Sequence, residues 1–100
     1  MRLALLLVSL SACASPAPDF FGAGRGEVTR GGIDFVVFHK GGEAEVVRMG
    51  YLTRAERAPV PHLMEDAAEA VTGCRVIPNS MRTKIPGDTG VARFDLDCRT

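Results

Sequence analysis

The chain has 100 residues, with 12 basic and 12 acidic side chains. This length allows one small domain with a single core. Because the net charge is zero and no basic stripe is interleaved with aromatic residues, the sequence gives no electrostatic support for binding nucleic acid. Its apolar runs are shorter than the roughly 20 residues that a helix needs to span a bilayer.

The chain begins with a short apolar run, residues 3–10, that follows the positive charge of Arg2. This length and charge are typical of a secretory signal peptide. The run ends in Leu10-Ser11-Ala12-Cys13, an aliphatic residue, two small residues and a cysteine. The motif resembles the lipobox of bacterial lipoprotein signal peptides, and the resemblance covers residues 1–13 only. It implies that residues 1–12 are removed, that Cys13 is acylated, and that the lipid bilayer is a partner of the chain.

The residue after the cysteine, Ala14, is compatible in that family with sorting to the outer membrane of a two-membrane cell, facing the periplasm. Two other interpretations stay open. Residues 12–14 also fit the cleavage site of an ordinary secretory signal, and an unprocessed cytosolic start is the third. The cysteine count favours the lipoprotein: with Cys13 acylated, Cys74 and Cys98 form one disulfide and leave no free thiol.

Removing the signal leaves 100 − 12 = 88 residues, with 11 basic side chains (Arg2 is lost) against 12 acidic ones. We expect residues 13–26 to be the lipidated cysteine and a flexible tether, because prolines and glycines punctuate them. Residues 27–100 would then form a single α+β domain. Phe20 and Phe21 stand out in the tether. We interpret them as a plug into the domain or the bilayer surface, and as candidate partner-binding residues.

Residues 27–49 predict a three-strand meander with turns at Gly31-Gly32 and Gly41-Gly42, because glycine supplies the positive φ of tight hairpin turns. Two-residue turns fix four side-chain pairs: Val28–Phe35 and Val37–Val46 on one face, Val36–Val47 and Phe38–Glu45 on the other. The middle strand is therefore apolar on both faces, whereas a strand with one wet face would alternate. A second layer must cover the far face: Phe20 and Phe21, residues 51–52, or another molecule.

Thr53 and Glu56 have the spacing of a capping box, and Pro59 limits any helix there to about one turn. Pro61 suits the first turn of a longer helix, and Gly73 suits its left-handed end. Between them the sequence predicts an amphipathic helix. Its apolar side holds Leu63, Met64, Ala67, Ala68, Ala70 and Val71, and its wet side holds His62, Glu65, Asp66 and Glu69.

Residues 74–78 and 91–98 predict two more strands, the second with a period of two. If Cys74 faces Cys98 across a hairpin, two further pairs follow: Val76–Leu96 on the same side and Arg75–Asp97 on the other. The cysteines and the apolar pair agree in register, which supports the disulfide. The predicted fold is α+β: a small, mostly antiparallel sheet in chain order β-β-β-α-β-β, with one amphipathic helix on one face. Residues 79–90 are expected to be a long polar connection.

The predicted core contains the inward-facing apolar residues: Val28, Phe35, Val37, Val46, Leu63, Ala67, Val71, Val76, Phe94 and Leu96. If the turns slip by one residue, the meander instead contributes Val36, Phe38, Val47 and Met49.

Residues that could carry chemistry are few. Asp88-Thr89-Gly90 is the triplet that small dimeric aspartic proteases carry after an apolar strand, but here it follows Pro86-Gly87, and we interpret it as a solvated turn. His39 and His62 are the only histidines, and zinc needs three or four ligands. We therefore expect no catalytic residues, no metal and no cofactor.

Arg82 and Lys84, with Arg93, could form a basic patch that touches anionic lipid or polysaccharide, although loop charges of this kind are more often simply solvated. We expect a small non-catalytic cell-envelope lipoprotein that binds a protein or an envelope component. The alternatives are a small periplasmic hydrolase or metal-binding enzyme, and a lipid-tethered structural spacer.

Overall fold

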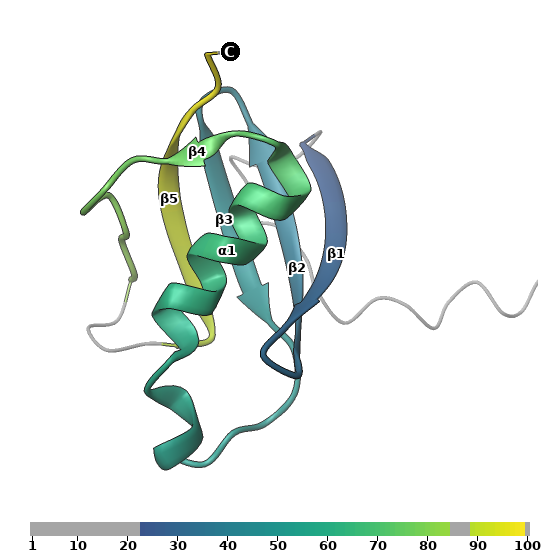
Figure 1. Cartoon of the computed structure of the whole chain (residues 1–100), viewed down its shortest axis with the longest axis vertical. Helices are drawn as coiled ribbons and strands as arrows, with labels where there is room; N and C mark the ends of the chain where they lie inside the picture. The colour runs from purple at the N-terminus through teal and green to yellow at the C-terminus, as the bar shows by residue number, and fades with distance from the viewer. Residues whose placement is uncertain (1–22, 85–88, 100) are drawn as a thin grey trace, which may run out of the picture.

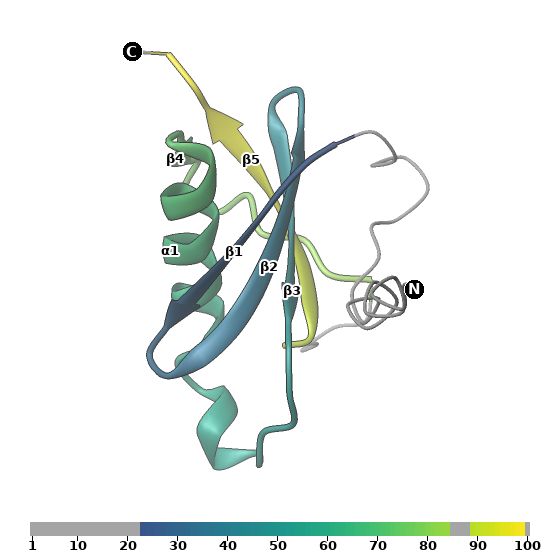
Figure 2. The ribbon, with the colours of Figure 1, turned by 90° about the vertical axis from the view of Figure 1, so that its right-hand side faces the viewer.

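The computed structural model describes residues 23–84 and 89–99. In chain order they form β1 (Gly24–Arg30), β2 (Ile33–Lys40), β3 (Glu43–Arg48), a 3-10 turn (Ala55–Arg57), α1 (Val60–Thr72), β4 (Arg75–Val76) and β5 (Val91–Asp97). The five strands form one curled antiparallel sheet, and α1 packs across one face of it (Figures 1 and 2). The predicted α+β fold and its chain order are confirmed.

Both glycine pairs make two-residue turns, and φ is positive at Gly31 (61°) and Gly41 (62°). The strand register contains all four predicted pairs: Val28–Phe35, Val37–Val46, Val36–Val47 and Phe38–Glu45. Phe35 and Val37 consequently pack in the cluster beneath α1, while Val36 and Phe38 belong to a separate cluster on the other face.

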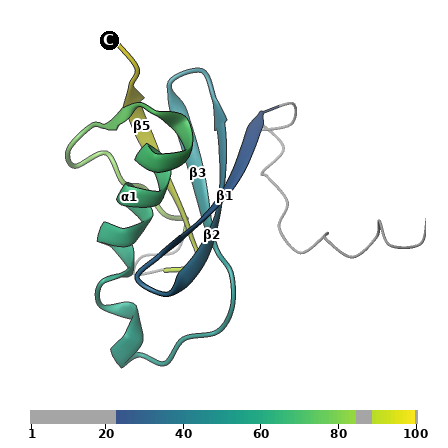
Figure 3. The same cartoon turned by 45° about the vertical axis from the view of Figure 1, so that its right-hand side comes forward.

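The last strand lies inside the sheet and not at its edge. The strand order is β1-β2-β3-β5-β4, so β5 separates β3 from β4. Because β5 is antiparallel to both neighbours, β3 and β4 run parallel to each other, and α1 is the crossover that joins them. Figure 3 shows α1 lying along the sheet on this crossover.

The tether prediction for residues 13–26 is wrong at its end, because β1 begins at Gly24. Gly24 and Gly26 pair with His39 and Val37. A Cβ built at Gly26 would lie 2.6 Å from Cγ1 of Val71, closer than atoms can pack. The glycine that resembled a linker residue therefore allows the close approach of α1 to β1.

The helix begins and ends near its predicted signals. Pro61 lies in the first turn, and Gly73 closes the helix at φ 75° with its N–H donated to the carbonyl of Glu69. The capping box before it is also present: Glu56 Oε1 accepts from Thr53 N at 2.8 Å, and Glu56 N donates to Thr53 Oγ1 at 3.3 Å. It serves the 3-10 turn, which ends before Pro59.

The core lies between α1 and the sheet. Six of the ten predicted core residues are buried in it, and the other four, Val28, Leu63, Val71 and Val76, are partly buried and pack against it. Five further residues are buried there: Ala44, Val60, Met64, Ala68 and Ala92. Of these, Met64 and Ala68 are on the predicted apolar side of the helix but not in the predicted core. Ala70, which the helical wheel placed on the apolar side, is exposed. It lies at the border of the apolar stripe, between Ala67 and Val71, which pack toward the sheet.

The connection after α1 is held to β5 more closely than predicted. β4 covers only Arg75–Val76, because Pro78 lacks an N–H and a turn follows in which Asn79 has φ 62°. Beyond that turn, Arg82 and Arg93 exchange two backbone hydrogen bonds of 2.9 and 2.8 Å. Part of the stretch predicted as a polar loop therefore continues the pairing along β5.

The predicted disulfide joins the end of α1 to the end of β5, with 4.4 Å between the α-carbons of Cys74 and Cys98. The neighbouring pairs Arg75–Asp97 and Val76–Leu96 have the predicted register. A second link lies beside it, because Glu69 Oε2 accepts a hydrogen bond from Val76 N at 2.8 Å.

Removing this disulfide should destabilise the domain strongly. The closed loop spans 98 − 74 + 1 = 25 residues, and chain entropy alone predicts a loss of about 3.5 kcal/mol in the free energy of unfolding for the Cys74→Ala/Cys98→Ala variant. Urea denaturation of the full chain, followed by circular dichroism, measures it. Reduction of the unmodified chain should give the same loss, and a change below about 1 kcal/mol in both would contradict a stabilising role.

Candidate interaction surface

Several predicted site residues lie outside the part of the chain that the structure describes. These are the lipidation site Cys13, the candidate partner-binding residues Phe20 and Phe21, and Asp88 of the turn triplet. Predictions that depend on them stay predictions.

The two histidines lie on different elements. His39 is on β2, and its ring packs over Gly24, where a Cβ would meet Nε2 at 2.6 Å. His62 is exposed on the wet side of α1. Within residues 23–84 and 89–99, no three side chains of histidine, cysteine, aspartate or glutamate gather closely enough to hold a metal ion.

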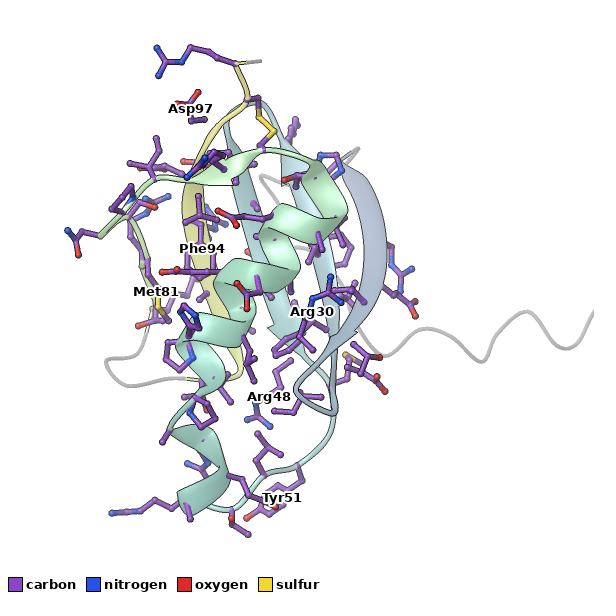
Figure 4. The ribbon with its side chains drawn as sticks, in the orientation of Figure 1. Arg30, Arg48, Tyr51, Met81, Phe94 and Asp97 are labelled. Carbon is purple, nitrogen blue, oxygen red and sulfur yellow. A yellow bond between two sulfur atoms is a disulfide. The ribbon has the colours of Figure 1, made fainter. Side chains whose placement is uncertain are left out.

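The described part of the Asp88-Thr89-Gly90 triplet has a structural contact. Arg48 Nε donates to the carbonyl of Thr89 at 2.9 Å, and Arg48 N donates to the carbonyl of Gly90 at 2.8 Å. The same guanidinium donates to the carbonyl of Gly50 at 2.9 Å. Arg48, labelled in Figure 4, thus ties the chain before β5 to the chain after β3. This contact fixes the backbone at the end of the loop.

The face of the sheet opposite α1 carries an apolar strip, which we call the far strip. It consists of Ala23, Val36, Phe38, Val47 and Met49. Val36 is 3% exposed and Phe38 is 4% exposed, so the prediction that β2 is buried on both faces is confirmed. The guanidinium of Arg25 lies 6.0 Å from the centre of the Phe38 ring, a distance at which a cation is attracted to an aromatic face.

One predicted cover for this face is wrong. Tyr51 is 89% exposed, and Leu52 packs against the core beneath α1 on the other side of the sheet. The chain turns toward the helix side after β3, which takes residues 51–52 away from the far strip. Figure 4 shows Tyr51 at the end of the molecule, below Arg48.

The far face is also not an open apolar surface. In the described part of the chain, only three large hydrophobic residues are exposed: Tyr51, Ile77 and Val91. A docking surface made of one broad apolar patch would need several hundred Å² of contiguous exposure. The burial of Val36 and Phe38 removes the centre of such a patch.

Ion pairs border the far strip. On one side, Arg25 and Glu27 of β1 pair at 2.8 Å. On the other side, Glu45 of β3 lies opposite Arg93 of β5, and Glu45 Oε1 is 3.2 Å from Arg93 Nε. Glu45 is only 5% exposed, so this is the most buried charged group of the described chain.

The predicted basic patch is largely balanced by acidic neighbours. Glu43 and Asp95 face each other across β3 and β5, and Arg82 bridges them with contacts of 3.3 and 3.0 Å. Arg93 is paired with Glu45. The third residue of the predicted basic patch, Lys84, is exposed. The candidate role of Arg82 and Lys84 in partner binding stays a prediction, but the charge that they were expected to share is locally compensated.

The last ion pair of the described chain lies at its end. Arg99 donates to both carboxylate oxygens of Asp97, at 2.8 and 2.7 Å, and these hydrogen bonds lower the pKa of Asp97 to about 2. The stabilisation from this pair is present above the ordinary pKa of an aspartate and is lost as the pH falls toward 2. Both groups are at the surface, so we attach no large stability to them.

The longest open feature of the sheet is the edge of β1. Arg30 and Ile33 flank a two-residue turn, so their backbone N–H and C=O groups bond to each other. Every second residue of β1, from Arg30 back to Gly24, is hydrogen-bonded to its partner on β2 in the same way. The N–H and C=O groups of Arg25, Glu27 and Thr29 therefore point away from the sheet. The carbonyl of Thr29 is capped by the Arg30 side chain at 2.9 Å. Among the described residues, no strand pairs with this edge.

No helix in the described residues is both long and apolar enough to cross a membrane. Comparison with known proteins adds no family: no protein-family model, no curated protein and no solved structure matches the chain.

The buried pair of Glu45 and Arg93 should matter more than the exposed contacts of Arg82. Arg93→Met removes the cation that faces the buried carboxylate, and we expect a loss of about 1–3 kcal/mol in the free energy of unfolding. Arg82→Met, the matched control, should cost less than about 1 kcal/mol because its pairs are half exposed. The double variant Glu45→Gln/Arg93→Met should recover part of the loss. Equal urea midpoints for the two single variants would show that burial of the pair has no consequence.

Proposed function

We propose that this chain is a lipid-anchored, non-catalytic domain of the bacterial cell envelope that binds an extended segment of an envelope protein along β1. The observation that carries the location is the disulfide between Cys74 and Cys98, at a Cα distance of 4.4 Å. Structural disulfides form in oxidising compartments and are rare in the cytosol of mesophiles. The lipobox-like Leu10-Ser11-Ala12-Cys13 supplies an address outside the cytosol, and the disulfide supports it independently.

The binding mode is supported by the two unequal edges of the sheet. At one edge, β4 has two residues and the chain beyond it stays paired with β5 through Arg82. At the other, β1 has seven residues and offers outward backbone groups at Arg25 and Glu27. An extended peptide adds to such an edge by main-chain hydrogen bonds. The paired charges of Arg25 and Glu27 beside these groups discourage unselective pairing, which is a common protection of natural edge strands.

The anchor is tested by the fate of Cys13. We expect the unmodified protein to be found in the membrane fraction after alkaline carbonate washing, with an intact mass equal to residues 13–100 plus acyl chains. Cys13→Ser should appear in the soluble extract, while the neighbouring variant Ala14→Ser should stay with the membranes. A mature amino terminus without acyl groups, or unchanged fractionation of Cys13→Ser, would contradict the anchor.

The edge is tested by site-specific photocrosslinking in intact cells. A photoreactive residue at Arg25 should give one discrete adduct, and the same residue at Asp66 on the wet side of α1 should give none. Adding Glu27→Pro should reduce the Arg25 adduct by about fivefold or more, because proline removes an outward N–H while leaving the β1–β2 ladder complete. Glu27→Ala, which removes the same carboxylate but keeps the outward N–H, should retain the adduct. An adduct that survives Glu27→Pro in a folded chain would exclude strand addition at β1.

A further inference from the structure

The open edge of β1 is complementary to itself in charge. Arg25 and Glu27 lie on the same face of the strand and pair at 2.8 Å, and their side chains are 41% and 63% exposed. The outward N–H and C=O groups of the same two residues are the ones to which an added strand would bond. In Figure 1, β1 is the outermost strand, and α1 lies over the strands beside it. Both charged side chains can therefore meet a partner strand that bonds to this backbone.

A second copy of β1 fits this edge best in one register. When an antiparallel pair is centred on Gly26, Arg25 of each copy faces Glu27 of the other, and each facing pair exchanges two main-chain hydrogen bonds. Centring the pair on Arg25 or on Glu27 places like charges directly opposite each other, which is destabilising. Centres farther from Gly26 leave Arg25 without a carboxylate opposite it. The charges of β1 therefore select the register centred on Gly26.

The other described residues of β1 are compatible with this register. Ala23 would face Thr29 of the other copy, and Gly24 would face Val28, so no further charges are opposed. The two Gly26 residues at the centre bring no side chains together. The carbonyl of Thr29 is already bonded to the Arg30 side chain, so we place the main-chain bonds between the copies at Arg25 and Glu27.

We infer that β1 pairs with β1 of a second copy of this chain, antiparallel and centred on Gly26, and joins two five-stranded sheets into one. The inference rests on the proposed function, because it names the extended segment that binds along β1. The pairing is a closed two-fold dimer, the commonest form of oligomer, in which every contact between unlike residues occurs twice. The charges of Arg25 and Glu27 from the two copies alternate in sign around the axis.

This dimer is compatible with the lipid anchor of the proposed function. The two-fold axis of an antiparallel pair in one continuous sheet is perpendicular to that sheet, so the same face of each copy points the same way. Both anchors can therefore enter one bilayer. Anchoring two copies in one membrane raises their effective concentration, which favours association through a short edge.

Charge reversal at the two positions tests the register in the full chain. In Arg25→Glu, glutamates face each other across the axis, and in Glu27→Arg, arginines do, so neither variant should pair with itself. When the two variants are combined, opposite charges face each other at both contacts, so the variants should pair with each other. Each variant loses the ion pair within β1, so that loss cannot explain recovery in the combination.

Co-purification measures the pairing. Two full-length copies with different carboxyl-terminal tags are produced in the same cells and solubilised in mild detergent, and one tag is captured. Recovery of the second copy should fall about fivefold or more when Arg25→Glu or Glu27→Arg is combined with itself. The combination of the two variants should return to within about twofold of the unmodified recovery. Arg54→Glu, the same reversal at an exposed arginine before the 3-10 turn, should leave the recovery unchanged.

Three results would overturn the dimer. The first is no recovery of the second copy of the unmodified chain. The second is full recovery when either reversal variant is combined with itself. The third is low recovery when the two variants are combined. If a single variant misfolds, Arg25→Glu/Glu27→Arg carries the test, because it restores the ion pair within β1 and both contacts between copies. This double variant should pair with itself, and its failure to do so in a folded chain would also overturn the dimer.

The photocrosslink at Arg25 separates this inference from the proposed function. An adduct with the mass of two copies of the chain supports the dimer. An adduct with a different envelope protein, together with no recovery of a second copy, overturns the dimer and leaves strand addition at β1 intact. Absence of any adduct, with no recovery of a second copy, overturns both.

Discussion

The structure depends on the insertion of β5 between β3 and β4. Ala92, Phe94 and Leu96 on one side of β5 complete the core beneath α1, and Arg93 on the other side pairs with the buried Glu45. Without β5, β3 would become an open edge and β4 would have no partner. These contacts join segments far apart in the chain, so forming them costs loop-closure entropy. The disulfide limits that entropy in the unfolded chain by linking Cys98, just after β5, to Cys74, just after α1.

The parts of the fold that the sequence predicts are those set by local chemistry or by a strict period. Gly31 and Gly41 fix two hairpin turns, and those turns fix the register of β1, β2 and β3. The cysteine positions and the period-two pattern give the register of β4 against β5. The pairing of β3 with β5 is different, because an alternating strand has the same pattern whichever neighbour it joins. The position of β5 inside the sheet is therefore invisible in the pattern and is seen only in the structure.

The same limit explains what the sequence could not show at the candidate surface. Arg82 and Lys84 suggested a basic patch because a sequence displays charges without their partners. Glu43, which pairs with Arg82, lies 39 residues earlier in the chain and meets it only through the β3–β5 pairing. Gly24 and Gly26 suggested a linker because glycine is common in linkers, yet at Gly26 it makes room for Val71. The two apolar faces of β2, by contrast, follow from the hairpin register and were predictable.

The two apolar faces of β2 are covered in two different ways. The helix side is closed by α1, which is fixed at its end by the disulfide and by Glu69 bonded to Val76. On the far side, Ala23, where the chain enters β1, packs with Val47 and Met49 against Val36 and Phe38. Arg25 of β1 adds to this cover, because its guanidinium lies 6.0 Å from the centre of the Phe38 ring. β1 therefore carries the open edge of the sheet and also part of the cover over the far face, and Arg25 belongs to both features.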